Sequence, residues 1–222
     1  MMNQAQPLKI RQLLTDGIAT LRLTLSEQQI QQLLAYLALL IKWNSVYNLT
    51  SVRDPIDMVR QHLLDTLAAV PAFSEAKSIL DVGAGGGLPG MVLAIAYPEK
   101  SVALIDTVTK KTAFLTQVKA ELGLKNVTVH TGRVEQLVSR VPFDVITSRA
   151  FSELANFVNW AGHCLAENGQ MIAMKGQLPE HEIEVLPEGW AVKKIQALIV
   201  PGLEAQRHLL WLQRVVPEAV VC

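Results

Sequence analysis

Hydrophobic side chains recur every three or four residues in the first third of the chain, a spacing that is typical of helices. The clearest series is Ile30, Leu33, Leu34, Leu37 and Ile41. Ser26 followed by Gln29 has the pattern of a capping box, which predicts where this helix begins. The Asp54–Pro55 pair is typical of a second helix start, and we expect that helix to cover residues 56–69. We therefore predict that residues 1–75 form a helical N-terminal extension packed on the rest of the chain.

From residue 76 onwards, short apolar runs alternate with amphipathic segments. The runs predict strands over 78–82, 102–105, 127–129, 143–147 and 171–174, then two consecutive closing strands over 192–200 and 208–215. The segments between them predict helices over 89–97, 110–122, 134–138, 152–165 and 180–186. Alternating strands and helices predict an α/β fold with helices on both faces of a mostly parallel, Rossmann-like sheet of seven strands, and the closing strands predict an antiparallel edge.

The composition indicates a folded protein without a membrane span. Half of the 222 residues are hydrophobic and 18% are charged, which excludes disordered and fibrous classes. The longest apolar run, residues 33–41, is about half as long as a bilayer requires. The first residues lack the apolar region of a secretory signal. Cys164 and Cys222 are therefore expected to be free thiols in a reducing cytoplasm.

The charges balance, with 20 basic and 20 acidic side chains. A net charge of zero argues against a protein that coats nucleic acid non-specifically, but it leaves room for a local basic patch. The five histidines and two cysteines show no spacing that is typical of metal ligands, so we expect no metal site.

A glycine cluster after the first predicted strand, Asp81 to Gly90, is the strongest chemical signal. Glycine permits the positive φ values and close ligand approach that a strand-to-helix turn requires, although a tight turn alone remains an alternative. Two cofactors fit the spacing. Gly85-x-Gly87-x-x-Gly90 matches a dinucleotide fingerprint. Asp81-x-Gly83-x-Gly85-x-Gly87 resembles the first motif of class I S-adenosylmethionine-dependent methyltransferases.

Two carboxylates favour the second cofactor. Asp81, just before the glycines, suits a ligand with a cationic amino-acid end and would lie poorly beside a pyrophosphate. Asp106 ends the second predicted strand, where its carboxylate could accept hydrogen bonds from ribose hydroxyls. Asp106 could also, or instead, be the N-cap of the helix that follows.

Further motifs come in the order seen in one protein family. They are Lys42-Trp43-Asn44, Tyr47 to Ser51, His62-x-x-Asp65, Gly83 to Gly90, Gly132 to Glu135, Ser148 to Phe151 and Lys175-Gly176. Over almost its whole length, the chain resembles the bacterial small-subunit rRNA guanine-N7 methyltransferases, also called glucose-inhibited division protein B. The resemblance implies that residues 76–222 form a class I methyltransferase domain, with residues 1–75 as its helical cap.

The resemblance also implies S-adenosylmethionine as the donor and N7 of one guanine in 16S rRNA as the acceptor. The expected partner is 16S rRNA or the 30S ribosomal subunit. The protein itself is expected to be a cytoplasmic monomer that binds no membrane. By motif, Gly83 and Leu88 fall at the cofactor, Val134 and Glu135 beside its adenine, and Arg149 near donor and acceptor. The predicted cofactor site comprises Asp81, Gly83, Gly85, Leu88, Asp106, Val134, Glu135 and Arg149.

The chemistry of N7 suits a site without an obligatory general base, because this atom offers a lone pair and loses no proton before attack. The enzyme then mainly aligns donor and acceptor. Arg149 is the best candidate for a substrate-side role, and a salt bridge to Asp81 or Asp106 is its alternative. Cys164 is expected to be a small core residue rather than a nucleophile.

RNA binding is expected from a local patch. Its candidates are Lys42, Asn48, Arg53, His62, Lys175, Arg207 and His208. Each has a simpler alternative: Lys175 could be a solvated surface charge, and His62 with Asp65 could make a packing or capping hydrogen bond. Trp43 is expected to pack the helical cap onto the sheet. Two rival functions remain, an NAD(P)-dependent oxidoreductase and a non-catalytic RNA-binding protein on the same scaffold.

Overall fold

The structure, a computed structural model, describes residues 5–215. Its N-terminal part contains helices α1 (Ala5–Thr20), α2 (Glu27–Tyr47), α3 (Pro55–Met58) and α4 (Asp65–Ala69), with a π-helical turn η1 (Val59–Leu64) before α4 and a 3-10 turn η2 (Val70–Phe73) after it. The strands are β1 (Ser78–Val82), β2 (Ser101–Asp106), β3 (Val127–Thr131), β4 (Phe143–Arg149), β5 (Leu165–Lys175), β6 (Trp190–Ala197) and β7 (His208–Arg214). The remaining helical elements are α5 (Gly90–Ala96), α6 (Thr109–Leu122), η3 (Val134–Gln136), α7 (Leu154–Ala161), η4 (Gly162–Cys164) and α8 (Glu180–Glu184).

The strands form a seven-stranded sheet in the order β3-β2-β1-β4-β5-β7-β6. Strands β1 to β5 are parallel to their neighbours among themselves, whereas β7 is antiparallel to both β5 and β6. This arrangement confirms the predicted mostly parallel sheet with an antiparallel edge. The chain turns from β1 towards β2 on one side and later returns to β4 on the other. The carboxyl ends of β1 and β4 therefore mark the switch point at which α/β proteins bind ligands.

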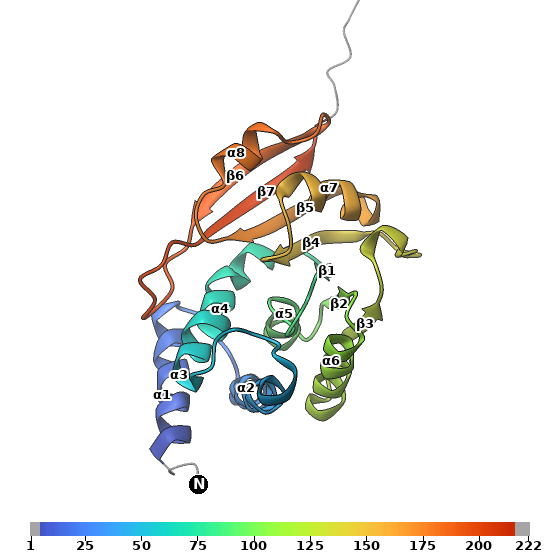
Figure 1. The fold of residues 1–222 in the computed structure, drawn as a ribbon. Coiled ribbons are helices and arrows are strands. Elements are labelled where there is room, and N and C mark those ends of the chain that lie inside the picture. Colours follow the sequence, from blue (N-terminus) through green and yellow to red (C-terminus); the bar gives the residue numbers. More distant parts are fainter. Residues whose placement is uncertain (1–4, 216–222) are drawn as a thin grey trace, which may run out of the picture.

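Helices cover both faces of the sheet (Figure 1). Alternate strand residues face each way, because side chains in a strand point to opposite faces in turn. Ile79 and Leu104 pack on the face covered by α5 and α6, and Leu80 and Ile105 pack on the face covered by α7. Helix α2 packs on α5 and α6 rather than on the sheet, so the N-terminal helices form an outer layer. They share one core with β1 and β2, and the division at residue 75 stays a prediction.

The predicted helix starts in the N-terminal part are confirmed. The Ser26 hydroxyl accepts a hydrogen bond from Gln29 N, and the Gln29 side chain accepts one from Ser26 N. The Asp54 carboxylate accepts from the backbone N–H groups of residues 56 and 57. The predicted helix over 56–69 is present as α3, η1 and α4, and its middle turn is π-helical.

The predicted helix over 152–165 is too long. Helix α7 ends at Ala161, and after the turn η4 the chain is already in strand β5 at Leu165. Gly169 lies inside this strand, where a β-carbon would approach the Asp144 carbonyl oxygen of β4 to 2.9 Å. Pairing of β5 with β4 therefore decides the conformation here, rather than local helix pattern. Cys164 is a free, buried thiol in η4, and Cys222 lies outside the described residues.

Candidate functional site

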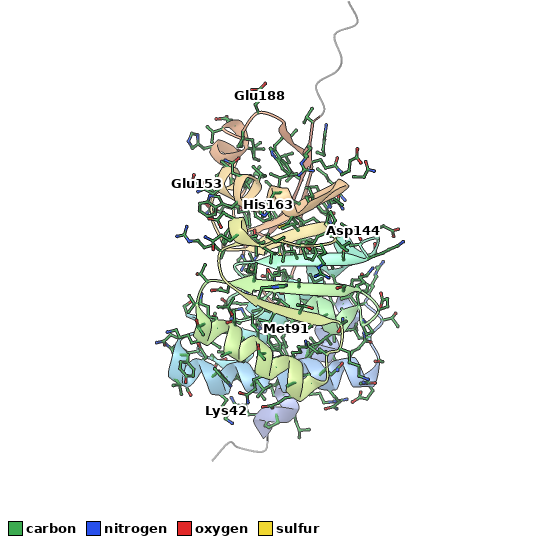
Figure 2. All side chains as sticks on the ribbon, turned by 90° about the vertical axis from the view of Figure 1, so that its right-hand side faces the viewer. Lys42, Met91, Asp144, Glu153, His163 and Glu188 are labelled. Atoms are coloured by element: carbon green, nitrogen blue, oxygen red, sulfur yellow. The ribbon has the colours of Figure 1, made fainter. Side chains whose placement is uncertain are left out.

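A cavity of about 310 Å³ opens at the carboxyl ends of β1, β2 and β4. We call it the first cavity. The residues of its wall that matter below are Gly83, Asp106, Val134, Glu135, Phe151 and Trp160. Figure 2 labels Glu153, which follows the carboxyl end of β4, and Asp144, which lies near the start of this strand. The first cavity lies at the carboxyl ends of the strands, the end that Glu153 marks.

The glycine loop beside the first cavity is held from two sides. The N–H groups of Gly83 and Ala84 both donate to the Ile105 carbonyl oxygen at the end of β2, at 2.9 and 3.0 Å. From the outer helical layer, the Tyr36 hydroxyl donates to the Gly86 carbonyl oxygen at 2.6 Å. Gly83 has φ +68° and faces the Phe151 ring, which leaves no room for a side chain. The loop is therefore fixed before any ligand arrives.

Asp106 connects the glycine loop to the wall of the first cavity. Its two carboxylate oxygens accept hydrogen bonds from Val108 N and Gly85 N, each at 2.9 Å. Lys111 Nζ lies 3.5 Å from the oxygen that Gly85 N contacts. The N-cap residue of α6 is Val108, so Asp106 is not the helix cap that was its alternative role. Its carboxylate instead bonds its own backbone two residues ahead.

Asp81 lies beneath the loop rather than on the cavity wall, contrary to the expectation that it faces the ligand. It is fully buried, and one carboxylate oxygen accepts a hydrogen bond from Gly90 N at 2.8 Å. The other oxygen has no hydrogen-bond partner among the described residues. Burial raises the pKa of Asp81 to about 7. Gly85 and the buried Leu88 do not line the first cavity either, and Gly85 acts on it through its hydrogen bond to Asp106.

A second cavity of about 390 Å³ lies beyond the end of β4. Its functional side chains are His62, Asp65, Arg149, Lys175, Arg207 and His208. Ala150 lines both cavities and has a left-handed backbone conformation, with φ +53°. The two cavities therefore meet at the residue that follows the last residue of β4.

Arg149 belongs to the second cavity. Its Nη1 donates to Asp65 Oδ2 at 3.1 Å and to the Gln61 carbonyl oxygen at 3.0 Å. The ion pair with Asp65 corrects the alternative in which Arg149 pairs with Asp81 or Asp106. The correction has a topological reason, since η1 and α4 of the helical cap pass over the end of β4 and bring Asp65 to it.

His62 is buried between Thr50 and Arg149. Its Nε2 lies 2.8 Å from Thr50 Oγ1, and its Nδ1 lies 3.4 Å from Arg149 Nη2. Because arginine can only donate, Nδ1 accepts and the ring proton lies on Nε2. Burial, and then the positive charge of Arg149, lowers the pKa of His62 to about 4. His62 is therefore neutral at neutral pH, with both ring nitrogens engaged.

The other predicted RNA contacts differ in whether they line the second cavity. Lys175, Arg207 and His208 line the second cavity. Lys175 is not a free surface charge, because its Nζ donates to Glu182 Oε2 at 2.8 Å and to the Ser152 carbonyl oxygen at 2.9 Å.

Asn48 and Arg53 flank the cavity without lining it. They bond each other, Arg53 Nη2 to Asn48 Oδ1, at 2.6 Å. Lys42 is exposed on α2 and lines neither cavity, at the end of the molecule opposite Glu188 (Figure 2).

The family described as rRNA small subunit methyltransferase G matches residues 29–210. The chain belongs to this family. Membership confirms the predicted enzyme class, an S-adenosylmethionine-dependent rRNA methyltransferase, and with it the predicted cofactor.

Individual relatives match most of the chain. The ribosomal RNA small subunit methyltransferase G of Herminiimonas arsenicoxydans is 64% identical over 206 residues, which are 91% of this chain and 94% of the relative. The protein of the same name from Janthinobacterium sp. (strain Marseille) is 62% identical over 208 residues, 92% of this chain and 94% of the relative.

The solved structures confirm the fold. The O-methyltransferase TomG from Streptomyces achromogenes, crystallised with S-adenosylmethionine, gives a TM-score of 0.59 at 15% identity and covers 91% of this chain and 96% of its own. At this identity the likeness shows the fold alone, and that fold is the predicted class I methyltransferase fold.

The aromatic wall of the first cavity goes beyond what the sequence indicated. Phe151 and Trp160 meet edge to face, with ring centroids 5.8 Å apart and planes at 80°. Phe151 belongs to a family motif, but Trp160 lies on α7 in an apolar pattern that gives no sign of a binding site. Trp43 packs the helical cap onto α6 and not, as predicted, onto the sheet, with its ring centroid 5.4 Å from that of Phe114.

Two further observations concern the kinds of site that a methyltransferase of this family could carry. Within residues 5–215, no three His, Cys, Asp or Glu side chains gather as metal ligands do. No helix in the described part of the chain combines the length and apolar character needed to cross a membrane.

Proposed function

We propose that the protein transfers the methyl group of S-adenosylmethionine to N7 of one guanine in 16S rRNA, as naked rRNA or in the 30S ribosomal subunit, and that it acts as a cytoplasmic monomer. The observation that carries the proposal is the meeting of two different cavities at Ala150. One has a carboxylate and an aromatic wall, which suits a nucleoside-containing donor. The other has five cationic or imidazole side chains and suits RNA.

The first cavity fits S-adenosylmethionine, which supplies the activated methyl group when bound. Asp106 ends β2 at the cavity wall, where its carboxylate can accept hydrogen bonds from ribose hydroxyls. Val134 and Glu135 would hold the adenine, and Phe151 with Trp160 would exclude water from it. The Gly90 N–H is already bonded to Asp81, so it is not free for a pyrophosphate, which disfavours the dinucleotide alternative.

Two acid–base side chains of the second cavity, Asp65 and His62, are already engaged, and guanine N7 requires no base. Asp65 is bound to two arginines, and neutral His62 has both nitrogens engaged. Because the N7 lone pair attacks without losing a proton, alignment of the two reactants is the main task. Arg149, Lys175, Arg207 and His208 would hold the RNA during the transfer.

The test is transfer of labelled methyl groups from S-adenosylmethionine to 30S subunits that lack the modification, followed by nucleoside analysis of the 16S rRNA. We expect the label in 7-methylguanosine. The Asp106→Ala variant serves as the control and should label the RNA more slowly than the wild-type protein at donor concentrations near the wild-type dissociation constant. Label in another nucleoside, or no transfer to either subunits or naked 16S rRNA, would overturn the proposal.

A further inference from the structure

Asp65 lies between two arginines that come from distant parts of the chain. Its Oδ2 accepts from Arg149 Nη1 at 3.1 Å, and its Oδ1 accepts from Arg207 Nε at 2.7 Å. The Asp65 side chain is 3% exposed, whereas the arginine side chains are 20% and 24% exposed. The carboxylate is thus hidden behind two guanidinium groups that line the second cavity.

Each guanidinium keeps N–H groups that no described residue accepts. An arginine has five N–H donors in a fixed plane. Arg149 uses its two Nη1 donors on Asp65 and Gln61 and one Nη2 donor on His62. Arg207 uses Nε on Asp65 and one Nη1 donor on the Gln206 carbonyl oxygen. The remaining donors on two neighbouring planes are suited to one anion with several oxygen atoms.

The charge balance explains why a carboxylate is needed at this place. Without the Asp65 carboxylate between them, the two guanidinium groups would repel each other. With Asp65 between them, the group carries one net positive charge and a defined geometry. Without a fixed partner, the two arginine side chains would not keep one orientation, because holding a long side chain in one conformation costs entropy.

We propose that Asp65 is a positioning residue that holds Arg149 and Arg207 together, and that the pair binds one phosphate of the RNA backbone beside the target nucleotide. The inference rests on the proposed function and extends it to a phosphate subsite. A backbone phosphate fits better than the N7 edge of the base, because an N–H donated to N7 would occupy the lone pair that reacts.

Asp65→Asn tests this proposal because a positioning role for Asp65 and a simple effect of net charge predict opposite changes in RNA affinity. The substitution adds one positive charge to the cavity, so attraction by net charge alone would tighten RNA binding. Loss of the aimed pair predicts the reverse. We expect affinity for 30S subunits to fall by about tenfold and the slope of affinity against salt concentration to become shallower by about one ion. The KM for 30S subunits should rise more than kcat falls, and donor affinity should stay unchanged.

Asp57→Asn is the matched control. Asp57 lies in the same helical segment and contacts Arg60 at 3.5 Å, but its side chain is 47% exposed. The substitution changes the net charge by the same amount without touching the second cavity. We expect 30S affinity to be unchanged or slightly tighter.

Arg207→Lys is the second variant, and it decides the question if Asp65→Asn does not fold. It keeps the charge but cannot donate to Asp65 and to a phosphate from one rigid plane. We expect the same loss of 30S affinity, and in the double variant a loss smaller than the product of the two single losses. Wild-type affinity and salt dependence in either folded variant would overturn the inference. Absence of methyl transfer by the wild-type protein would instead overturn the proposed function, since binding is measured separately.

Discussion

The ring of Phe151 lies against the backbone of Gly83 at the wall of the first cavity. A β-carbon at Gly83 would overlap this ring, and the φ of +68° at Gly83 is one that other residues adopt only with strain. The ring in turn contacts Trp160 edge to face. Gly83 therefore sets the position of an aromatic wall as well as the path of the loop.

Gly83→Ala should weaken donor binding by at least about tenfold, because the new methyl group displaces Phe151 from the cavity wall. Calorimetric titration with S-adenosylhomocysteine measures the effect directly.

Gly123→Ala separates strain from overlap. Gly123 has a similar φ of +64° at the end of α6, but no atom lies within 4 Å of a β-carbon there. We expect this variant to lose about 1 kcal/mol of stability and to keep its donor affinity. Equal losses of donor affinity in both variants would show that strain alone, and not the Phe151 ring, is responsible.

Asp106→Ala should raise the dissociation constant for the donor by more than about tenfold, since a carboxylate that accepts charge-assisted hydrogen bonds is lost together with its hold on Gly85. Asp144→Ala is the matched control at the opposite edge of the sheet, where Asp144 accepts from Lys77 N and Ser78 N (Figure 2). It should lower the melting temperature and leave donor affinity intact. A comparable loss of donor affinity in both variants would refute a specific role for Asp106.

Tyr36→Phe should lower the free energy of unfolding by about 1–2 kcal/mol, because the hydrogen bond from the buried Tyr36 hydroxyl to the Gly86 carbonyl oxygen is lost. Thermal unfolding would show this as a drop of about 3–6 °C. Tyr47→Phe, on the same helix at a side chain that is 39% exposed, should leave the melting temperature within about 1 °C of wild type. Similar melting temperatures for all three proteins would contradict a structural hydrogen bond from Tyr36 to the loop.

His62→Gln should make the protein less sensitive to acid. The pKa of His62 is about 4 in the folded protein and has its ordinary value of 6.5 in the unfolded chain. The unfolded chain therefore binds this proton first, so the contribution of neutral His62 is complete above pH 6.5 and is lost as the pH falls towards 4. Glutamine cannot take up the proton.

The measurement for His62 is the melting temperature of both proteins from pH 7.5 to 4.5. Over this range the free energy of unfolding of the wild-type protein should fall by up to roughly 3 kcal/mol more than that of the variant, which the melting temperatures report as a larger drop. The raised pKa of Asp81 acts with the opposite sign, but it is common to both proteins and cancels in the difference. Parallel curves would show that folding does not lower the pKa of His62.

Elements whose limits depend on local contacts could be predicted from the sequence. The capping box of Ser26 and Gln29 and the left-handed Gly123 at the end of α6 are such contacts. The end of α7 could not be predicted, because it depends on the pairing of Leu165 with Phe143 and on the close approach of Gly169 to Asp144. These residues are far enough apart in the chain that no local pattern records the contact.

The candidate site also has a part that could be predicted from the sequence and a part that could not. Gly83, Asp106, Val134 and Glu135 line one cavity because the topology brings the ends of parallel strands to one edge. The direction in which a side chain points from such an end could not be read from the sequence. Asp81 points under the loop, and Arg149 points to Asp65 on the helical cap. Both directions depend on elements that the fold places there from elsewhere in the chain.

Strand β7 is the last strand to be synthesised, yet it lies between β5 and β6. Its residues Leu209 and Trp211 also join the core that contains Leu14 and Leu33 of the N-terminal helices. A chain interrupted before residue 208 would therefore hold a complete glycine loop and Asp106 but leave β5 with an open edge and the first helices with uncovered apolar surface. Protection from aggregation and from proteases thus comes only with β7, after the residues that line the first cavity have been synthesised.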